Sequence, residues 1–175
     1  MVLAVCAAAA FFTGCSSRTA MTPLATATGV DIQRYAGHWY EVFRLPNSFQ
    51  RDDAKAEANY TLQRDGTVRV VNTETRPDGT QKTAEGTATV VPDGRNSRFR
   101  VKFEGLAALI PVSEEGNYWI VKLEPDYSAA LVGTPDRKFL WLLSRTPKIN
   151  AERRNSYEAE ARRLGFDTRQ LIHSR

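Results

Sequence analysis

The amino-acid sequence predicts an all-β fold: an eight-stranded antiparallel up-and-down β-barrel with one C-terminal α-helix packed on the outside. Segments in which apolar and polar residues alternate indicate strands with one buried face. Turn sequences containing Asp-Gly or Pro-Asp separate these segments at short intervals, as in a meander of hairpins. Gly37 and Trp39 open the first strand and Arg145 closes the last, an arrangement typical of a small barrel sealed at its base. We therefore expect one closed and one open end.

The individual strands follow from the alternation between turn signals. The clearest is RFRVKF at residues 98–103, in which basic and apolar side chains alternate with a period of two. The turn around Gly66 predicts a hairpin, and those around Gly79 and Gly94 divide the chain in the same way. The eight expected strands cover residues 39–45, 57–62, 68–75, 82–91, 98–103, 118–123, 129–133 and 139–144.

One helix is expected after the last strand. Asn150 is a good N-cap, and Gly165 is placed to end the helix before Phe166. Tyr157, Ala161 and Leu164 fall at helical spacing, with Arg and Glu at most other positions. This pattern predicts a helix that packs a single stripe against the barrel wall.

The N-terminal sequence indicates a targeting segment. The apolar run 2–12 is too short to span a bilayer and fits the core of a signal peptide. FTGCS at 12–16 resembles the lipobox of bacterial lipoproteins, although Phe12 replaces the usual Leu and no basic residue follows Met1. An uncleaved apolar leader and an ordinary signal peptide are the alternatives. The resemblance implies that Cys15 carries acyl chains, and that Ser16 directs the protein to the outer membrane, with the domain facing the periplasm.

The expected organisation has three parts. Residues 1–14 form the lipoprotein signal peptide, residues 15–29 the acylated Cys and a flexible tether, and residues 30–175 the barrel with its helix. Several long acyl chains anchor a protein stably, since each buried methylene contributes about 0.8 kcal/mol.

Composition narrows the range of functions. With 24 Lys and Arg against 20 Asp and Glu, and no run of basic residues longer than two, the sequence argues against a nucleic-acid partner. Both cysteines, Cys6 and Cys15, precede the expected domain, so it can hold no disulfide or Cys-ligated metal. His38 and His173 are isolated in sequence, and we expect neither a metal site nor a cofactor.

Three sequence blocks carry a family resemblance. They are YAGHWYE at 35–41 with RLPNSF at 44–49, EPDY at 124–127 with ALVG at 130–133, and LWLLSRTP at 140–147. In this order they resemble the signature blocks of lipocalins, and specifically those of bacterial outer-membrane lipocalins related to apolipoprotein D. The resemblance covers residues 30–172 and implies that Arg145 stacks on Trp39 across the barrel floor, with Gly37 permitting the close approach. These three residues are expected to be structural.

Counting by twos from an inward-facing Trp39 predicts the residues that line a ligand cavity. The alternative is that the same side chains simply fill a solid core. The candidates are Glu41, Phe43, Phe99, Val101, Phe103, Trp119, Val121, Phe139 and Trp141.

The expected mouth of the barrel combines basic residues with an apolar loop. Arg44, Arg51, Lys55 and Arg137 would suit an anionic head group, although a solvated charged rim has the same composition. The loop containing Leu106, Leu109 and Ile110 is apolar enough to act as a packed lid, as a contact for acyl chains, or as a membrane or homodimer contact.

The hypothesis from sequence is therefore a membrane-anchored lipid-binding protein and not an enzyme. It would hold a fatty acid, a lysophospholipid or a similar amphiphile in the barrel, for storage or transport in envelope maintenance. A carrier of another apolar ligand such as haem, or a structural envelope protein with a filled barrel, is the alternative. Catalysis would need a constellation of Cys, His or metal ligands that the sequence after Cys15 lacks.

Overall fold

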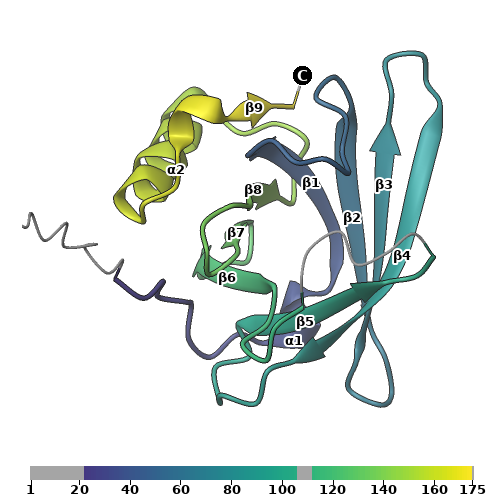
Figure 1. The fold of residues 1–175 in the computed structure, drawn as a ribbon, viewed down its shortest axis with the longest axis vertical. Helices are drawn as coiled ribbons and strands as arrows, with labels where there is room; N and C mark the ends of the chain where they lie inside the picture. Colours follow the sequence, from purple (N-terminus) through teal and green to yellow (C-terminus); the bar gives the residue numbers. More distant parts are fainter. Residues whose placement is uncertain (1–21, 106–111, 175) are drawn as a thin grey trace, which may run out of the picture.

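A closed antiparallel β-barrel forms the body of the molecule (Figure 1). The computed structural model describes residues 22–105 and 112–174. Each barrel strand pairs with the next along the chain, and β1 closes the barrel by pairing with both β8 and β2. The strands are β1 (Gly37–Arg44), β2 (Lys55–Leu62), β3 (Val68–Thr75), β4 (Gln81–Val90), β5 (Arg98–Phe103), β6 (Tyr118–Leu123), β7 (Ala129–Gly133) and β8 (Leu140–Ser144). This confirms the predicted eight-stranded up-and-down topology.

Aspartates shape the turns between these strands. In five turns an Asp carboxylate accepts a hydrogen bond from the backbone N–H two residues further on, at 2.9 to 3.2 Å. This Asx geometry closes a turn locally, which explains why Asp marks the strand boundaries so reliably. The aspartates are Asp65, Asp78, Asp93, Asp126 and Asp136.

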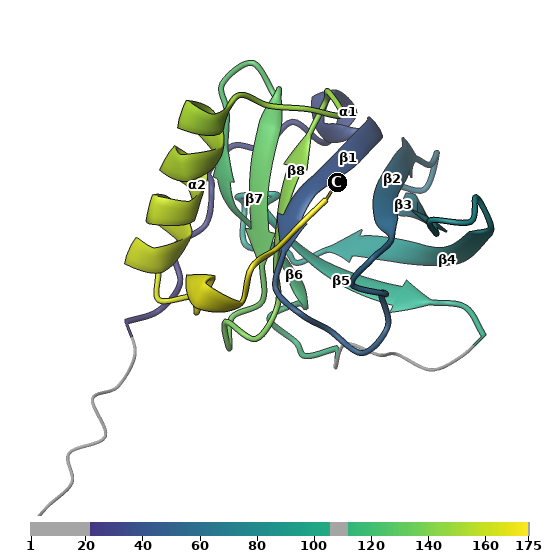
Figure 2. The ribbon, with the colours of Figure 1, turned by 90° about the horizontal axis from the view of Figure 1, so that it is seen from above.

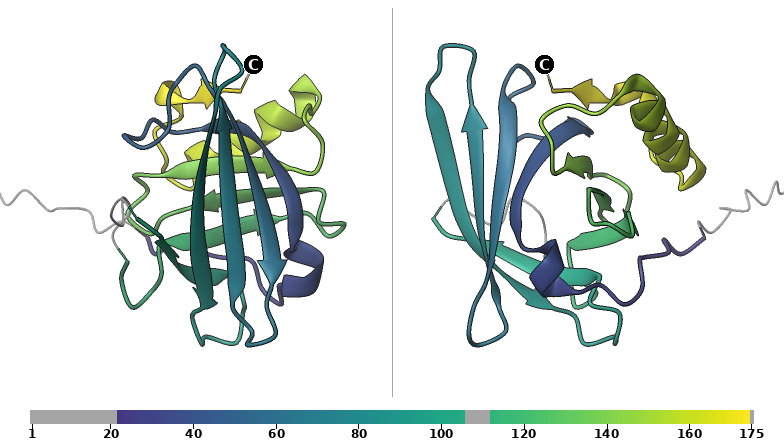
Figure 3. Two further views of the ribbon diagram at one scale, coloured as in Figure 1. Left: turned by 90° about the vertical axis from the view of Figure 1, so that its right-hand side faces the viewer. Right: turned by 180° about the vertical axis from the view of Figure 1, so that it is seen from behind.

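The barrel is flattened into two layers whose strands cross. Strands β2–β4 run across the direction of β6–β8 in the left view of Figure 3. At the two seams the pairing is short: β1 pairs with β2 only from Gly37 to Tyr40, and β5 pairs with β6 only at Arg98 and Phe99. Both short ladders lie near Trp39, so the layers are joined at that end and diverge toward the other.

Helix α1 (Ile32–Tyr35), which the sequence analysis did not predict, lies at the joined end of the barrel. Asp31 caps it by accepting a hydrogen bond from the Arg34 N–H at 3.2 Å. Its short length explains the omission, because one turn carries no helical periodicity.

Helix α2 (Ala151–Arg163) lies along the outside of the barrel (Figure 2). The Asn150 side chain accepts from the Arg153 N–H at 2.8 Å, which confirms the predicted N-cap. Gly165, at φ +90°, ends the helix with the Phe166 N–H bonded to the Ala161 carbonyl. One apolar cluster lies inside the barrel around Trp39. The buried face of α2 packs against the outer faces of the strands in a second apolar cluster, which contains Tyr157, Ala161, Leu131, Leu142 and Phe166. Of the helices in the described ranges, none is both long and apolar enough to cross a membrane.

The C-terminal segment completes the sheet. After the short 3₁₀ helix η1 (Thr168–Gln170), strand β9 (Ile172–His173) pairs with β1, with His173 opposite Phe43 and Ile172 opposite Arg44. This part of β1 lies beyond its ladder with β2. Strand β9 therefore takes the place that β2 leaves as the two layers diverge.

The chain before α1 differs from the expected flexible tether over residues 22–29. Leu24 is buried in the second apolar cluster. The Ala27 N–H donates to the Ile120 carbonyl at 2.8 Å, and the Thr26 and Ser97 hydroxyls are bonded at 3.0 Å. These contacts fix residues 22–29 to the barrel.

Candidate ligand-binding cavity

The joined end of the barrel is a closed floor built around Trp39. The Arg145 guanidinium carbon lies 3.7 Å from the centre of the Trp39 ring, which is fully buried. Gly37 has φ +98°, and a Cβ built there would lie 3.3 Å from Arg145 Nη1, so the residue is small for conformational and steric reasons. Arg145 also donates to the carbonyls at the end of α1, which ties the helix to the last strand.

Above this floor the barrel encloses a cavity of about 320 Å³. That volume falls within the range of small-molecule sites. The cavity extends from Tyr35 near the floor to Phe49, Phe103 and Lys82 at the opposite end. Its middle walls are apolar and come from β2–β5: Ala58, Val68, Val70, Ala88, Phe99 and Val101.

Five of the nine predicted lining residues border this cavity: Glu41, Phe99, Val101, Phe103 and Trp141. Phe139 does not border it. Its ring stacks on Trp141 with the centroids 6.1 Å apart, and Phe49 covers both rings at the mouth.

The prediction is wrong for Phe43, Trp119 and Val121, which belong to the cluster beneath α2. In β1 the ladder with β8 shifts register between Glu41 and Phe43. A bulge adds one residue and exchanges inside and outside beyond it, so counting by twos fails there. In β6 the error has a different cause: the counting starts on the wrong face, because Tyr118 faces the cavity whereas Trp119 and Val121 face out.

Three tyrosines that the sequence analysis missed form the deep end of the cavity. The Tyr35 and Tyr118 hydroxyl oxygens lie 2.7 Å apart, and those of Tyr60 and Tyr118 lie 3.2 Å apart. All three residues border the cavity. Tyr60 could have been found from its alternation with Ala58, whereas Tyr35 lies on the unpredicted helix α1.

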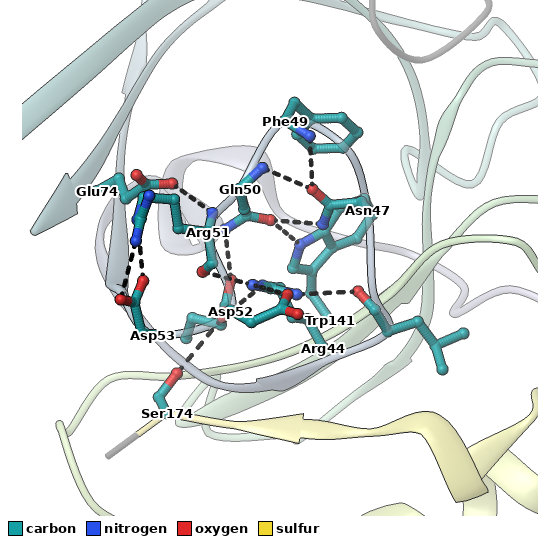
Figure 4. A network of polar contacts seen from close by, with 12 residues as sticks. Arg44, Asn47, Phe49, Gln50, Arg51, Asp52, Asp53, Glu74, Trp141 and Ser174 are labelled. Atoms are coloured by element: carbon teal, nitrogen blue, oxygen red, sulfur yellow. Dashed lines mark hydrogen bonds and ion pairs between the residues drawn. The ribbon is translucent and has the colours of Figure 1, made fainter. Parts of the chain in front are cut away.

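At the mouth, a polar network holds the loop between β1 and β2 (Figure 4). Glu41 accepts from Gln50 Nε2 at 2.9 Å and faces Arg44 Nε at 3.4 Å. Gln50 in turn accepts from Trp141 Nε1 at 3.0 Å. Arg44 Nη2 donates to the Arg51 carbonyl at 2.7 Å and to Asp52 at 3.3 Å.

Glu41 and Arg44 are both almost completely buried, with side chains 5% and 1% exposed. Burial raises the pKa of Glu41, and the hydrogen bond from Gln50 and the charge of Arg44 oppose that shift. Since a buried charge needs a partner, each of these two groups supports the other. Their arrangement fixes the loop that carries Phe49 to the mouth.

The predicted basic mouth needs correction. Arg44 is buried in the network just described and is not free for a ligand. Arg137 is bound to the Leu164 carbonyl and to the Thr22 carbonyl, both at 2.6 Å, and so joins α2 to the N-terminal segment.

The other predicted basic residues do not border the cavity either. Arg51 is bound to Asp53, and Lys55 is exposed. Of the described residues that line the cavity, only Lys82 is cationic, and it lies opposite Glu74 in the β3–β4 ladder. Cys15 and the loop residues Leu106, Leu109 and Ile110 lie outside the described residues.

Within the described part of the chain, no cluster of three or more His, Cys, Asp or Glu side chains is arranged to hold a metal ion. The cavity offers an apolar wall, a group of phenols at the deep end, and a charged part of the lining in which one lysine stands among several glutamates.

A sealed barrel of this topology around an apolar cavity defines a class of small-ligand-binding barrels. Comparison with known proteins agrees: residues 30–175 match the lipocalin-like domain family, and the chain belongs to the lipocalins. The chain is 37% identical to the outer membrane lipoprotein Blc of Citrobacter freundii over 98% of its own length and 93% of that protein. It is 35% identical to apolipoprotein D of Rattus norvegicus over 70% of the chain and 64% of that protein.

These relatives confirm the predicted place of the chain among lipocalins similar to Blc and apolipoprotein D. Among solved structures, the cockroach allergen Per a 4 superposes with a TM-score of 0.61 at 20% identity, covering 86% of this chain and 90% of the allergen. At that identity the likeness supports the fold alone.

Proposed function

We propose that the protein is a membrane-anchored lipid carrier that holds one fatty acid, lysophospholipid or similar amphiphile for storage or transport in envelope maintenance. The observation that carries this proposal is the apolar cavity of about 320 Å³, which is closed at the Trp39 floor and extends to the mouth. Apolar walls with few polar groups are typical of sites that bind by burying a chain.

Burial of the acyl chain supplies the affinity. A chain with about fourteen methylenes contributes roughly 11 kcal/mol at about 0.8 kcal/mol each, and ordering of the ligand offsets much of it. Phe49, Phe103 and Trp141 contact the chain where it enters the cavity.

The head group remains at the mouth, beside Lys82 and Glu74. Lys82 lies opposite Glu74, and the cavity lining also includes Glu57, Glu85 and Glu104, so a zwitterionic head group suits the site better than a purely anionic one. This differs from the basic mouth of three arginines and Lys55 expected from the sequence, and it argues against a purely electrostatic selection of anionic lipids.

Binding, and not catalysis, is the proposed activity. Glu41 is a buried carboxylate that could be considered for catalysis, but Gln50 and Arg44 hold it in the network that anchors the mouth loop. Its contacts suit a structural role.

The membrane anchor is proposed at Cys15. The relative from Citrobacter freundii is an outer membrane lipoprotein and aligns over nearly the whole chain, which supports the same location here, with the domain in the periplasm. If residues 15–21 form the whole tether, they would span about 15 Å as a flexible coil. Replacing Cys15 by Ser should release the protein from the membrane fraction and abolish labelling with palmitate. Retention and labelling of this variant would contradict the assignment.

The carrier proposal is tested by filling the cavity. Ala88 faces the cavity, and its neighbour Thr87 faces solvent on the same strand. We expect Ala88→Phe to weaken binding of palmitic acid and lysophosphatidylcholine, followed by tryptophan fluorescence, by tenfold or more. The matched variant Thr87→Phe should bind as the original protein does. Absence of saturable binding in the original protein, or equal binding by both variants, would refute the proposal.

A further inference from the structure

The floor of the cavity is polar at one point, where three phenols meet. Tyr118 lies between Tyr35 and Tyr60, with its hydroxyl oxygen 2.7 Å from the first and 3.2 Å from the second. Tyr35 and Tyr60 are 4% and 7% exposed, and all three residues border the cavity. Among the described residues, these two contacts are the hydrogen bonds that the three hydroxyls make.

Counting protons shows that this cluster has one donor to spare. Three hydroxyls carry three protons, and the two hydrogen bonds between them use two. Whichever way the bonds are directed, one O–H remains without an acceptor, on the first, the middle or the last tyrosine. A buried donor without an acceptor is costly, so an apolar chain that excludes water from this end is penalised.

The phenols are donors at all physiological pH values. Burial raises the pKa of Tyr60 to about 12 and raises the pKa values of Tyr35 and Tyr118 well above the ordinary value of 10.0. The cluster therefore offers a neutral O–H group. An ionised ligand group at this depth would lose its hydration, which a single neutral donor does not replace.

We propose that Tyr35, Tyr60 and Tyr118 form a polar subsite at the deep end of the cavity, which selects lipids whose buried end carries a neutral oxygen such as a hydroxyl or a ketone. This inference rests on the proposed function, because it needs a lipid chain in the cavity. The carrier would then prefer oxygenated lipids over plain saturated chains of the same length.

The first test compares ligands on the chain with its three tyrosines intact. The protein used is the full chain carrying Cys15→Ser, because it cannot be acylated at that position. Saturated fatty acids of increasing length are titrated beside their ω-hydroxy and (ω−1)-keto counterparts. We expect the oxygenated chain to bind about tenfold more tightly at the length that reaches the tyrosines, and less advantage at shorter lengths. The ketone should share the gain, since it only accepts hydrogen bonds.

The second test removes the hydroxyls. All three tyrosines are replaced by Phe, because any smaller set leaves at least one free O–H. Replacing mutually bonded groups by apolar groups of the same shape is close to neutral for folding, which circular dichroism would check. The preference for oxygenated chains should disappear while plain chains bind as well or better. Tyr40→Phe is the matched control, since Tyr40 does not border the cavity.

The outcomes are distinct. Equal affinity for plain and oxygenated chains at every length in the original protein would overturn the subsite but leave the carrier function intact. Retention of the preference in the triple variant would also overturn it. Failure of every chain to bind would instead refute the proposed function.

Discussion

Replacement of Arg145 by Ala should destabilise the barrel strongly. The side chain lies over Trp39 at 3.7 Å and reaches across the floor to α1. It donates to the carbonyls of Arg34 at 2.8 Å, Tyr35 at 3.0 Å and Ala36 at 2.9 Å. It thereby satisfies carbonyl groups at the end of a one-turn helix, of which that of Tyr35 also accepts from Trp39 Nε1 at 2.9 Å.

The size of the effect follows from these contacts. A hydrogen bond to a charged group contributes about 1.5–3 kcal/mol, and a partly desolvated cation–π contact contributes about 1–2 kcal/mol. The bonds from one guanidinium are not additive, and water reaches some of the freed carbonyls. Counting one strong bond and the ring contact gives about 2.5–5 kcal/mol for Arg145→Ala. Arg145→Lys should recover only a minor part, since a single ammonium cannot reproduce the planar fork.

Urea unfolding followed by circular dichroism measures this loss, with Arg69→Ala as the control. Arg69 forms a 2.6 Å ion pair with Glu85 on the surface, where both side chains are about half exposed. Such pairs contribute up to about 1 kcal/mol. If Arg145→Ala cost no more than Arg69→Ala, the interpretation of the floor as a stabilising closure would be wrong.

Three further predictions concern other parts of the barrel. Phe43→Ala should lower the free energy of unfolding in urea by about 3–5 kcal/mol but leave the affinity for palmitate unchanged, since Phe43 packs beneath α2. A folded Phe43→Ala variant with reduced affinity would instead show that Phe43 contacts the ligand. Gly133→Ala should lower the free energy of unfolding by about 1–3 kcal/mol, because a Cβ there would lie 2.7 Å from Phe166 Cζ. Phe166→Leu in the same chain should relieve part of that loss, and additive losses in the double variant would contradict the clash. Burial raises the pKa of Glu41 above 4.5, so as the pH falls the Glu41 carboxylate is protonated in the folded chain before it is protonated in the unfolded chain. The protonated Glu41 therefore stabilises the fold at low pH, and this stabilisation is lost as the pH rises through the pKa of the folded state. Glu41→Gln should flatten this part of the stability curve, whereas an identical curve would show that Glu41 does not titrate there.

The barrel could be predicted from sequence because its rules are local. Alternation sets each strand, and aspartates such as Asp65 close the turns by bonding backbone two residues away. Helix α2 was predictable for the same reason, since Asn150 and Gly165 mark its ends within one turn. Family blocks then placed Trp39 and Arg145 on the floor, where the structure has them in contact.

The cavity was harder to predict because its lining depends on pairing between distant strands. The bulge before Phe43 comes from the ladder with β8, and nothing in the β1 sequence marks it. Arg44 illustrates a second obstacle. A basic residue at the end of a strand suggests a solvated rim, yet its partners are Glu41 and the backbone of a loop that folds back over it.

Strand β9 protects the molecule as well as completing it. Without the pairing of Ile172 and His173 to β1, the mouth half of that strand would present free N–H and C=O groups beside the diverging β2. Such an edge is a template for pairing with another chain. Strand β9 thus limits self-association through this edge, and deletion of residues 172–174 should first cause aggregation on mild heating.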